Sequence, residues 1–268
     1  MSFQAVLASI AGDAWRSWRT LALWPWPAVC IGYPKAKFTW IDYRRFCRAL
    51  QPGDLLLMTA ERYFLSNRGI SGTALKHLAI YTGSVAGEQD EEGFIRGVVS
   101  VGGKAPLARL EGKTVHDRTV VHSVSEGVVC QDLGDVLFHE DYVVAVRPWI
   151  SEQERKTIVS ESVQQLGKSY NFDFTQDGPP ELYCTELGEF CCVRAGVIPP
   201  ERVKMNVNWK GLFIPLGRYK AYVSVADRFA LHFPIVAMSK HVDNRNFWGK
   251  SCWAEDLRQR ITTCTRKI

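Results

Sequence analysis

The sequence predicts an α+β protein, with a small antiparallel sheet or open barrel packed against helices on one side. Short apolar runs separated by turns begin after Gln51-Pro52-Gly53, as strands do. The connections between these runs are mostly short, which favours antiparallel pairing. From Ser151 the pattern changes to a helical one. The 268 residues are 46% hydrophobic and 23% charged, which is enough apolar material for a core.

The first predicted element is an amphipathic helix over residues 3–22, followed by a proline-broken connection through Pro34. This helix either packs on the main domain or lies in a membrane interface. The chain contains no run of about 18 apolar residues that could span a bilayer, and Asp13 interrupts the early apolar run, unlike a secretory signal. We therefore expect cytoplasmic synthesis without a cleavable signal peptide. Peripheral membrane attachment and export by a non-classical route remain open.

Six strands are predicted after residue 51. Glycine and proline break strands, so we expect Gly83 to end the second predicted strand. For the same reason Gly102-Gly103 should end the third strand, and Pro148 should end the last one. Glu126-Gly127 forms a turn between the fourth and fifth. The predicted strands cover residues 54–59, 76–82, 94–101, 119–125, 127–131 and 142–147.

Two helices follow the strands. Ser151 and Glu154 have the spacing of a capping box, which predicts a helix over residues 151–166. A second helix is predicted over residues 184–196, after a loop rich in Asp, Gly and Pro. The pattern assigns no elements to residues 201–239.

The charge of the chain divides it into three parts. The net charge is +5, yet residues 1–50 carry +5, residues 240–268 carry +4 and residues 51–239 carry −4. Seven of the nine tryptophans also lie in the two basic ends. We therefore expect a basic, Trp-rich extension over 1–50, a main domain over 51–232 and a basic extension over 233–268. Basic residues mixed with Trp suit either domain packing or a membrane surface.

Cys184 is the cysteine whose context favours reactivity. It stands at a predicted helix start directly after a loop, and a helix N-terminus lowers a thiol pKa. A thiolate nucleophile also needs a base and a group that orients that base. His77 and His122 each lie on a face of a predicted strand that is otherwise apolar, so neighbouring strands would bring the two rings together. The alternative for each residue is a buried thiol or histidine with a purely structural role.

Other kinds of site find little support. The sequence lacks the His-Glu-x-x-His and Cys-x-x-Cys spacings of metal sites, and it lacks the glycine-rich phosphate loops. No nucleic-acid-binding motif accompanies the basic ends. We therefore expect no metal, no cofactor and no nucleic-acid partner.

Four short blocks resemble a known family. Pro52-Gly53-Asp54-Leu55, the strand from His77 to Gly83, the strand around His122 and the segment from Tyr170 to Leu187 are similar, in that order, to blocks of the circularly permuted NlpC-like hydrolases of the papain-like superfamily. The resemblance covers about residues 51–200. The base precedes the nucleophile in the chain, as permutation requires. Gly188 departs from the family pattern, which usually has an apolar residue such as Val there.

The resemblance implies a papain-like core with Cys184 as nucleophile, His77 as base and His122 as third residue. Many permuted members have Glu at the third position, so Glu126 is an alternative. Tyr183 and Asp54 are candidate pocket or oxyanion residues. The implied activity is hydrolysis of an amide bond in a peptide, an isopeptide or a cell-wall stem peptide through a thioester. A lipid acyl hydrolase or acyltransferase that uses residues 1–50 and 240–268 to bind a membrane, and a non-catalytic binding module, are the alternatives.

Overall fold

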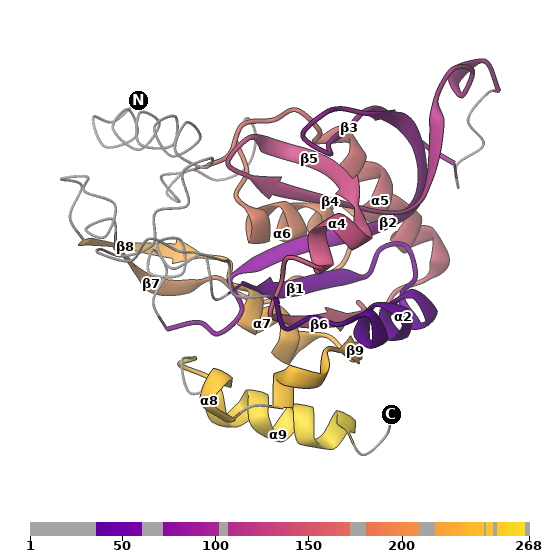
Figure 1. Cartoon of the computed structure of the whole chain (residues 1–268). Helices are drawn as coiled ribbons and strands as arrows, with labels where there is room; N and C mark the ends of the chain where they lie inside the picture. The colour runs from indigo at the N-terminus through magenta and orange to yellow at the C-terminus, as the bar shows by residue number, and fades with distance from the viewer. Residues whose placement is uncertain are drawn as a thin grey trace, which may run out of the picture.

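A computed structural model describes residues 36–60, 72–101, 107–171, 181–208, 218–243, 245–248 and 251–265. Within these residues the chain forms a mixed α+β domain around one large antiparallel sheet (Figure 1). The fold class predicted from the sequence is confirmed. The predicted helix over residues 3–22 lies outside the described residues.

The large sheet has seven strands in the order β5-β4-β2-β1-β6-β9, and β3 pairs with β2 off this path. All the pairings are antiparallel, and the sheet does not close into a barrel. Five of the six predicted strands are present within a few residues of their predicted bounds. The second, β2, is much longer than predicted. The strands are β1 (Leu55–Thr59), β2 (His77–Gln89), β3 (Ile95–Ser100), β4 (Thr114–Val124), β5 (Gly127–Asp132), β6 (Tyr142–Val146) and β9 (Ile235–Met238).

Strand β2 continues past Gly83, where the sequence predicted its end. Gly83 has φ +75, a conformation that glycine adopts at little cost, and the pairing with β4 shifts register on both sides of it. A bulge therefore carries the strand through the glycine. The longer β2 pairs with β1 and β4 at its start and with β3 and β4 beyond the bulge.

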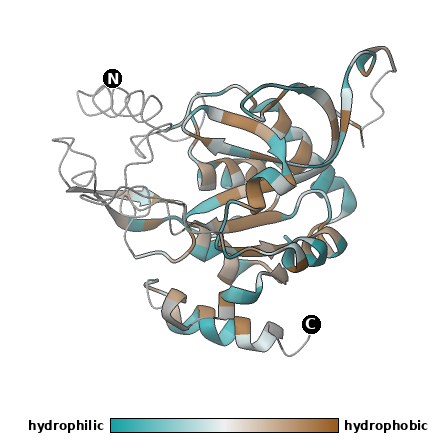
Figure 2. Cartoon of the chain, in the orientation of Figure 1, coloured by the Kyte–Doolittle hydropathy of each residue, from teal (hydrophilic) through white to brown (hydrophobic). Residues whose placement is uncertain are grey.

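Helices cover both faces of the sheet, whereas the sequence predicted them on one (Figure 1). On the face that carries Leu78 and Ile80, the apolar core includes side chains from α5 (Glu152–Gln164), α6 (Cys184–Arg194) and α7 (Ala226–His232). The opposite face, with Ala79 and Tyr81, packs against α2 (Trp40–Ala49) and α4 (Leu133–Leu137). The strands between the two helical layers accordingly consist largely of hydrophobic residues (Figure 2). The predicted capping box at Ser151 is present at the start of α5.

The C-terminal residues are joined to this sheet. Strand β9, from the segment expected as an extension, pairs with β6, and η3 (Lys240–Asp243), α8 (Arg245–Trp248) and α9 (Ala254–Thr265) follow. Trp248 is fully buried and donates from Nε1 to the Val242 carbonyl at 2.7 Å. This tryptophan therefore serves domain packing, the first of the two interpretations of the Trp-rich ends. A two-stranded sheet, β7 (Val203–Asn208) and β8 (Arg218–Val223), lies beside the main one.

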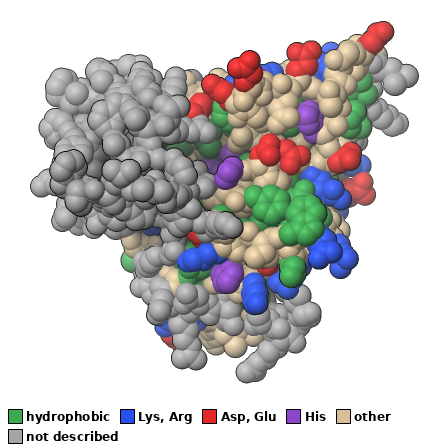
Figure 3. Space-filling model, viewed as in Figure 1, with side chains coloured by type: hydrophobic (Ala, Val, Ile, Leu, Met, Phe, Trp, Pro, Cys, Tyr) green, Lys and Arg blue, Asp and Glu red, His purple; other side chains and the backbone are tan. Residues whose placement is uncertain are grey.

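The surface separates charges by region. In Figure 3 acidic side chains gather over the upper part of the view, and Lys and Arg lie mostly lower and to the right. Trp40, at the start of α2, is 59% exposed and stacks on Tyr43 and Phe138, with ring centroids 5.1 and 5.7 Å away. None of the described helices is long and apolar enough to cross a membrane.

Candidate active site

Two histidine rings meet where β2 begins. His77 is the first residue of β2. His122 of β4 pairs with Ala79 of β2, two residues after His77, so the two histidines are diagonal neighbours on one face of the sheet. His77 Nε2 lies 2.9 Å from His122 Nδ1, within hydrogen-bonding distance. The predicted contact between two histidines on neighbouring strands is therefore present.

Gln131 extends this pair onto a third strand, and the sequence did not single it out. His122 Nε2 lies 2.9 Å from Gln131 Oε1. Val129 of β5 pairs with His122, so Gln131, two residues further along, lies on the same face as the two rings. The signal available in the sequence was the alternation of Val129 and Gln131 in a strand that follows the strand of His122.

Cys184 is the first residue of α6 and lies against the same end of β2. Its thiol donates to the Lys76 carbonyl, with Sγ 3.8 Å from the oxygen, and the sulfur accepts hydrogen bonds from the backbone N–H groups of Leu78 and Thr185. The sulfur therefore touches the peptide backbone on both sides of His77. Between the two described side chains Cys184 and His77 there is no hydrogen bond, as is common in active sites without substrate. Cys184 is only 7% exposed.

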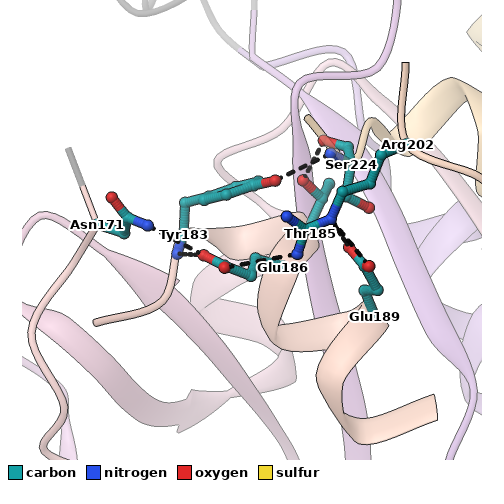
Figure 4. A network of polar contacts seen from close by, with 7 residues as sticks. All are labelled: Asn171, Tyr183, Thr185, Glu186, Glu189, Arg202 and Ser224. Atoms are coloured by element: carbon teal, nitrogen blue, oxygen red, sulfur yellow. Dashed lines mark hydrogen bonds and ion pairs between the residues drawn. The ribbon is translucent and has the colours of Figure 1, made fainter. Parts of the chain in front are cut away.

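Glu186 holds the start of α6 in place (Figure 4). Its carboxylate accepts hydrogen bonds from the Tyr183 backbone N–H and from Asn171 Nδ2, each at 3.3 Å. Arg202 lies 3.6 Å from Glu186 and 2.9 Å from Glu189 one turn later. An acidic residue in the first turn also interacts favourably with the helix dipole. These contacts fix the position of the first turn, which presents Cys184.

Ser224 makes a second set of contacts with this turn (Figure 4). Its backbone N–H donates to the Tyr183 hydroxyl at 2.9 Å, and Thr185 Oγ1 donates to its carbonyl at 2.7 Å. Tyr183 is buried, and its hydroxyl is engaged with Ser224. The structure therefore places this candidate pocket residue among the groups that hold the helix.

Gly188 allows α6 to approach β2 closely. A Cβ at this position would lie 2.7 Å from Leu78 Cδ2 and 2.9 Å from Leu78 Cδ1, which is too close for a real contact. Leu78 is fully buried and immediately follows His77. The departure of Gly188 from the usual apolar residue thus has a structural reason, because a larger side chain would push the helix of Cys184 away from the strand of His77.

Comparison with protein families gives one match. The model of the family described as "Permuted papain-like amidase enzyme, YaeF/YiiX, C92 family" matches residues 49–207, which is more than half of the chain. The chain belongs to the permuted papain-like amidase family. No curated protein and no solved structure matched in the corresponding searches. The matched residues of this papain-like amidase include His77, His122, Gln131 and Cys184.

Burial sets the protonation of the amidase site. Burial raises the pKa of the Cys184 thiol to about 11, against the lowering effect of the Leu78 and Thr185 N–H groups. Burial, together with the neighbouring His122, lowers the pKa of His77 to about 3. Between these values both the Cys184 thiol and the His77 imidazole are neutral in the free enzyme. Tyr170 adds a hydroxyl that hydrogen bonds to Cys184, and burial raises the pKa of this tyrosine well above its usual value.

The remaining candidates lie elsewhere in the amidase. Asp54 is fully buried and accepts two hydrogen bonds from Arg147, at 2.7 and 2.8 Å, and one from the Gln51 N–H at 2.8 Å. These contacts are those of a structural ion pair. Glu126 lies in the turn between β4 and β5, since β4 ends at Val124, and accepts a hydrogen bond from Ser125 at 2.7 Å. The predicted turn between the two strands is therefore present, and it places Glu126 beyond the strand that carries His122.

Among the residues that the structure describes, no group of three or more His, Cys, Asp or Glu side chains is arranged to hold a metal ion. The described polar groups around Cys184 are instead those of proton transfer and hydrogen bonding.

Proposed function

We propose that this cysteine hydrolase cleaves amide bonds through a Cys184–His77–His122 triad and a thioester intermediate. The observation that carries the proposal is the position of the Cys184 sulfur, which lies at a helix N-terminus and against the backbone on both sides of His77. The Nε2 atom of His77 is engaged with His122, so Nδ1 is the nitrogen left to act on the thiol. A nucleophile, a base and a group that orients the base are the parts that acyl transfer needs.

In the first half of the reaction, His77 Nδ1 takes the proton of the Cys184 thiol while the sulfur attacks the amide carbonyl. The negative charge that develops on the carbonyl oxygen is stabilised by the backbone N–H of Cys184, which points out of the first turn of α6. The C–N bond then breaks, and His77 returns the proton to the leaving amine. The product is a thioester between the acyl group and Cys184.

In the second half, water attacks the thioester. His77 takes a proton from this water, and the tetrahedral intermediate collapses to a carboxylic acid. The Cys184 sulfur leaves as the thiolate and recovers its proton from His77. Because Cys184 and His77 are both neutral in the free enzyme, this mechanism requires no thiolate–imidazolium ion pair before the substrate binds.

The NlpC-like branch is the one we propose within the wider permuted papain-like family. Its support is the histidine at the third position, His122, together with the order of the four sequence blocks. A peptide, an isopeptide or a cell-wall stem peptide is the proposed substrate.

The test is mass spectrometry of the purified full-length chain after incubation with peptide, isopeptide and stem-peptide amides and, separately, with phospholipid vesicles. We expect an acyl adduct on Cys184 from an amide. Cys184→Ala should form no adduct at this position, and His77→Gln should form the adduct at least about 1,000-fold more slowly. Glu126→Gln is the control and should react like the wild type. An adduct from the vesicles alone would assign a lipid acyl hydrolase. If Cys184 neither forms an adduct nor reacts with a chloroacetamide near neutral pH, the chain is a binding module.

A further inference from the structure

We infer that Gln131 is a positioning residue of this site, whose amide oxygen fixes the tautomers of both histidines so that His77 Nδ1 can accept the thiol proton. The inference rests on the proposed function for its catalytic meaning. It is carried by two consecutive hydrogen bonds: Gln131 Oε1 to His122 Nε2, and His122 Nδ1 to His77 Nε2, each 2.9 Å long.

The position of each proton along this row is set by its neighbour. A neutral imidazole carries one N–H and one acceptor nitrogen, and an amide oxygen only accepts. Gln131 Oε1 therefore requires the proton of His122 on Nε2. His122 Nδ1 is then an acceptor and requires a proton on His77 Nε2. His77 Nδ1 is left with a lone pair, which is what a general base needs.

The opposite orientation of the Gln131 amide would reverse the whole row. An N–H group facing His122 would place the proton of His122 on Nδ1, and this N–H would donate to His77 Nε2. His77 would then carry its proton on Nδ1 and could not take one from Cys184. The orientation of one amide on β5 thus decides whether a base exists on β2, two strands away.

The surroundings of Gln131 favour the productive orientation. A Cβ at Gly93 would lie 3.9 Å from Gln131 Nε2 and 3.8 Å from Asp135 Oδ2, so the amide nitrogen and this carboxylate lie beside the same glycine. Asp135 Oδ2 accepts a hydrogen bond from Gln89 Nε2 at 3.4 Å, and its negative charge on this side of Gln131 favours the orientation with the NH₂ end toward the carboxylate and the oxygen toward His122. The role of Gln131 is therefore electrostatic and directional, and a side chain that only fills the space should not replace it.

The experiment follows histidine tautomers by ¹⁵N NMR in the full-length chain labelled at histidine. The rate at which a chloroacetamide labels Cys184 near neutral pH is measured alongside. In the wild type we expect Nε2–H on both His77 and His122. Gln131→Glu keeps an acceptor, and at a pH where His122 stays neutral beside the added carboxylate it should preserve both tautomers and a labelling rate within about twofold. Gln131→Met has nearly the same shape without a polar end. It should move both tautomers mostly to Nδ1–H and slow labelling about 10- to 100-fold, because only roughly 1–10% of His77 would then keep an unprotonated Nδ1.

Gln164→Met, on the exposed face of α5, is the matched control and should change neither measurement. Unchanged tautomers in Gln131→Met, or changed tautomers with an unchanged labelling rate, would overturn the inference. If Gln131→Met does not fold, Gln131→Glu decides, because a shift of its histidines to Nδ1–H would also overturn it. Failure of the wild type to hydrolyse any amide would instead count against the proposed function, since the NMR result does not depend on a substrate.

Discussion

Gly188 of α6 packs directly on Leu78 of β2, with no room for a Cβ between them. This contact sets the distance between the helix that carries Cys184 and the strand that begins at His77. Inserting methyl groups into such a well-packed contact usually costs about 1–3 kcal/mol. Gly188→Val should therefore lower the free energy of unfolding by about this amount and displace Cys184 from the base.

Thermal unfolding and chloroacetamide labelling of Gly188→Val would measure the two effects. We expect a lower melting temperature and slower labelling of Cys184. Val193→Ala is the control, because Val193 is 57% exposed on the same helix. Labelling at the wild-type rate in Gly188→Val would mean that the close contact does not position the thiol.

The Cys184 thiol should be protonated in the free enzyme at neutral pH, because burial raises its pKa to about 11. The ultraviolet absorbance of a thiolate, taken as the difference between the wild type and Cys184→Ser, should be absent near neutral pH. It should appear only as the pH approaches 11. A thiolate signal already present near pH 7 would show instead an ion pair between Cys184 and His77.

His77 should make the protein less stable in mild acid. Its pKa is lowered to about 3 in the folded chain, whereas a histidine in the unfolded chain titrates near its usual value of about 6.5. Between these values the unfolded state binds the extra proton, so stability falls as the pH drops from about 6.5 toward 3. Above about 6.5 both states are neutral and this effect vanishes.

Urea unfolding of the wild type and His77→Gln across this pH range would measure the effect. The variant should lose less stability on acidification than the wild type. His241→Gln, at an exposed position, is the control. Parallel pH profiles for the wild type and His77→Gln would contradict the prediction.

Asp54 should matter for stability rather than for catalysis. It is fully buried, and Asp54→Asn would leave Arg147 without its charged partner. Breaking one side of a buried ion pair usually costs about 3–5 kcal/mol. We expect a loss of this order in urea unfolding, with labelling of Cys184 at the wild-type rate in the fraction that remains folded. Slower labelling of Cys184 in that fraction would indicate instead that Asp54 contributes to the catalytic pocket.

The sequence predicted the two histidines and the cysteine because each stands in a regular element. Alternation along a strand determines the face of His77 and of His122, and a helix start is visible from the loop before Cys184. Gln131 was not predicted, because a polar residue at the end of a strand has the same pattern whether it faces water or a histidine. The ion pair between Asp54 and Arg147 was not predicted either. Arg147 lies 93 residues away in the sequence, and only the pairing of β1 with β6 brings the two side chains together.

The elements that the sequence missed depend on distant contacts. Helix α2 spans only ten residues and buries Phe46 against the sheet, whereas Trp40 and Ile41 remain exposed, so apolar character alone does not tell which of its residues face the core. Strand β2 passes Gly83 because β3 and β4 pair with it beyond the bulge. A glycine alone does not reveal whether such partners exist.

The carboxylate of Asp227, fully buried in α7, accepts hydrogen bonds from the backbone N–H groups of Ala74 and Leu75 and from Ser251 Oγ, at 2.9, 2.8 and 2.5 Å. These two N–H groups stand just before His77. The position of the base is therefore fixed by residues that leave the ribosome about 150 residues after it. A nascent or truncated chain can hold both His77 and Cys184 and still lack the anchor that aligns them. Activity should therefore arise only after the segment that contains Asp227 and Ser251 has been synthesised and has folded onto Ala74 and Leu75.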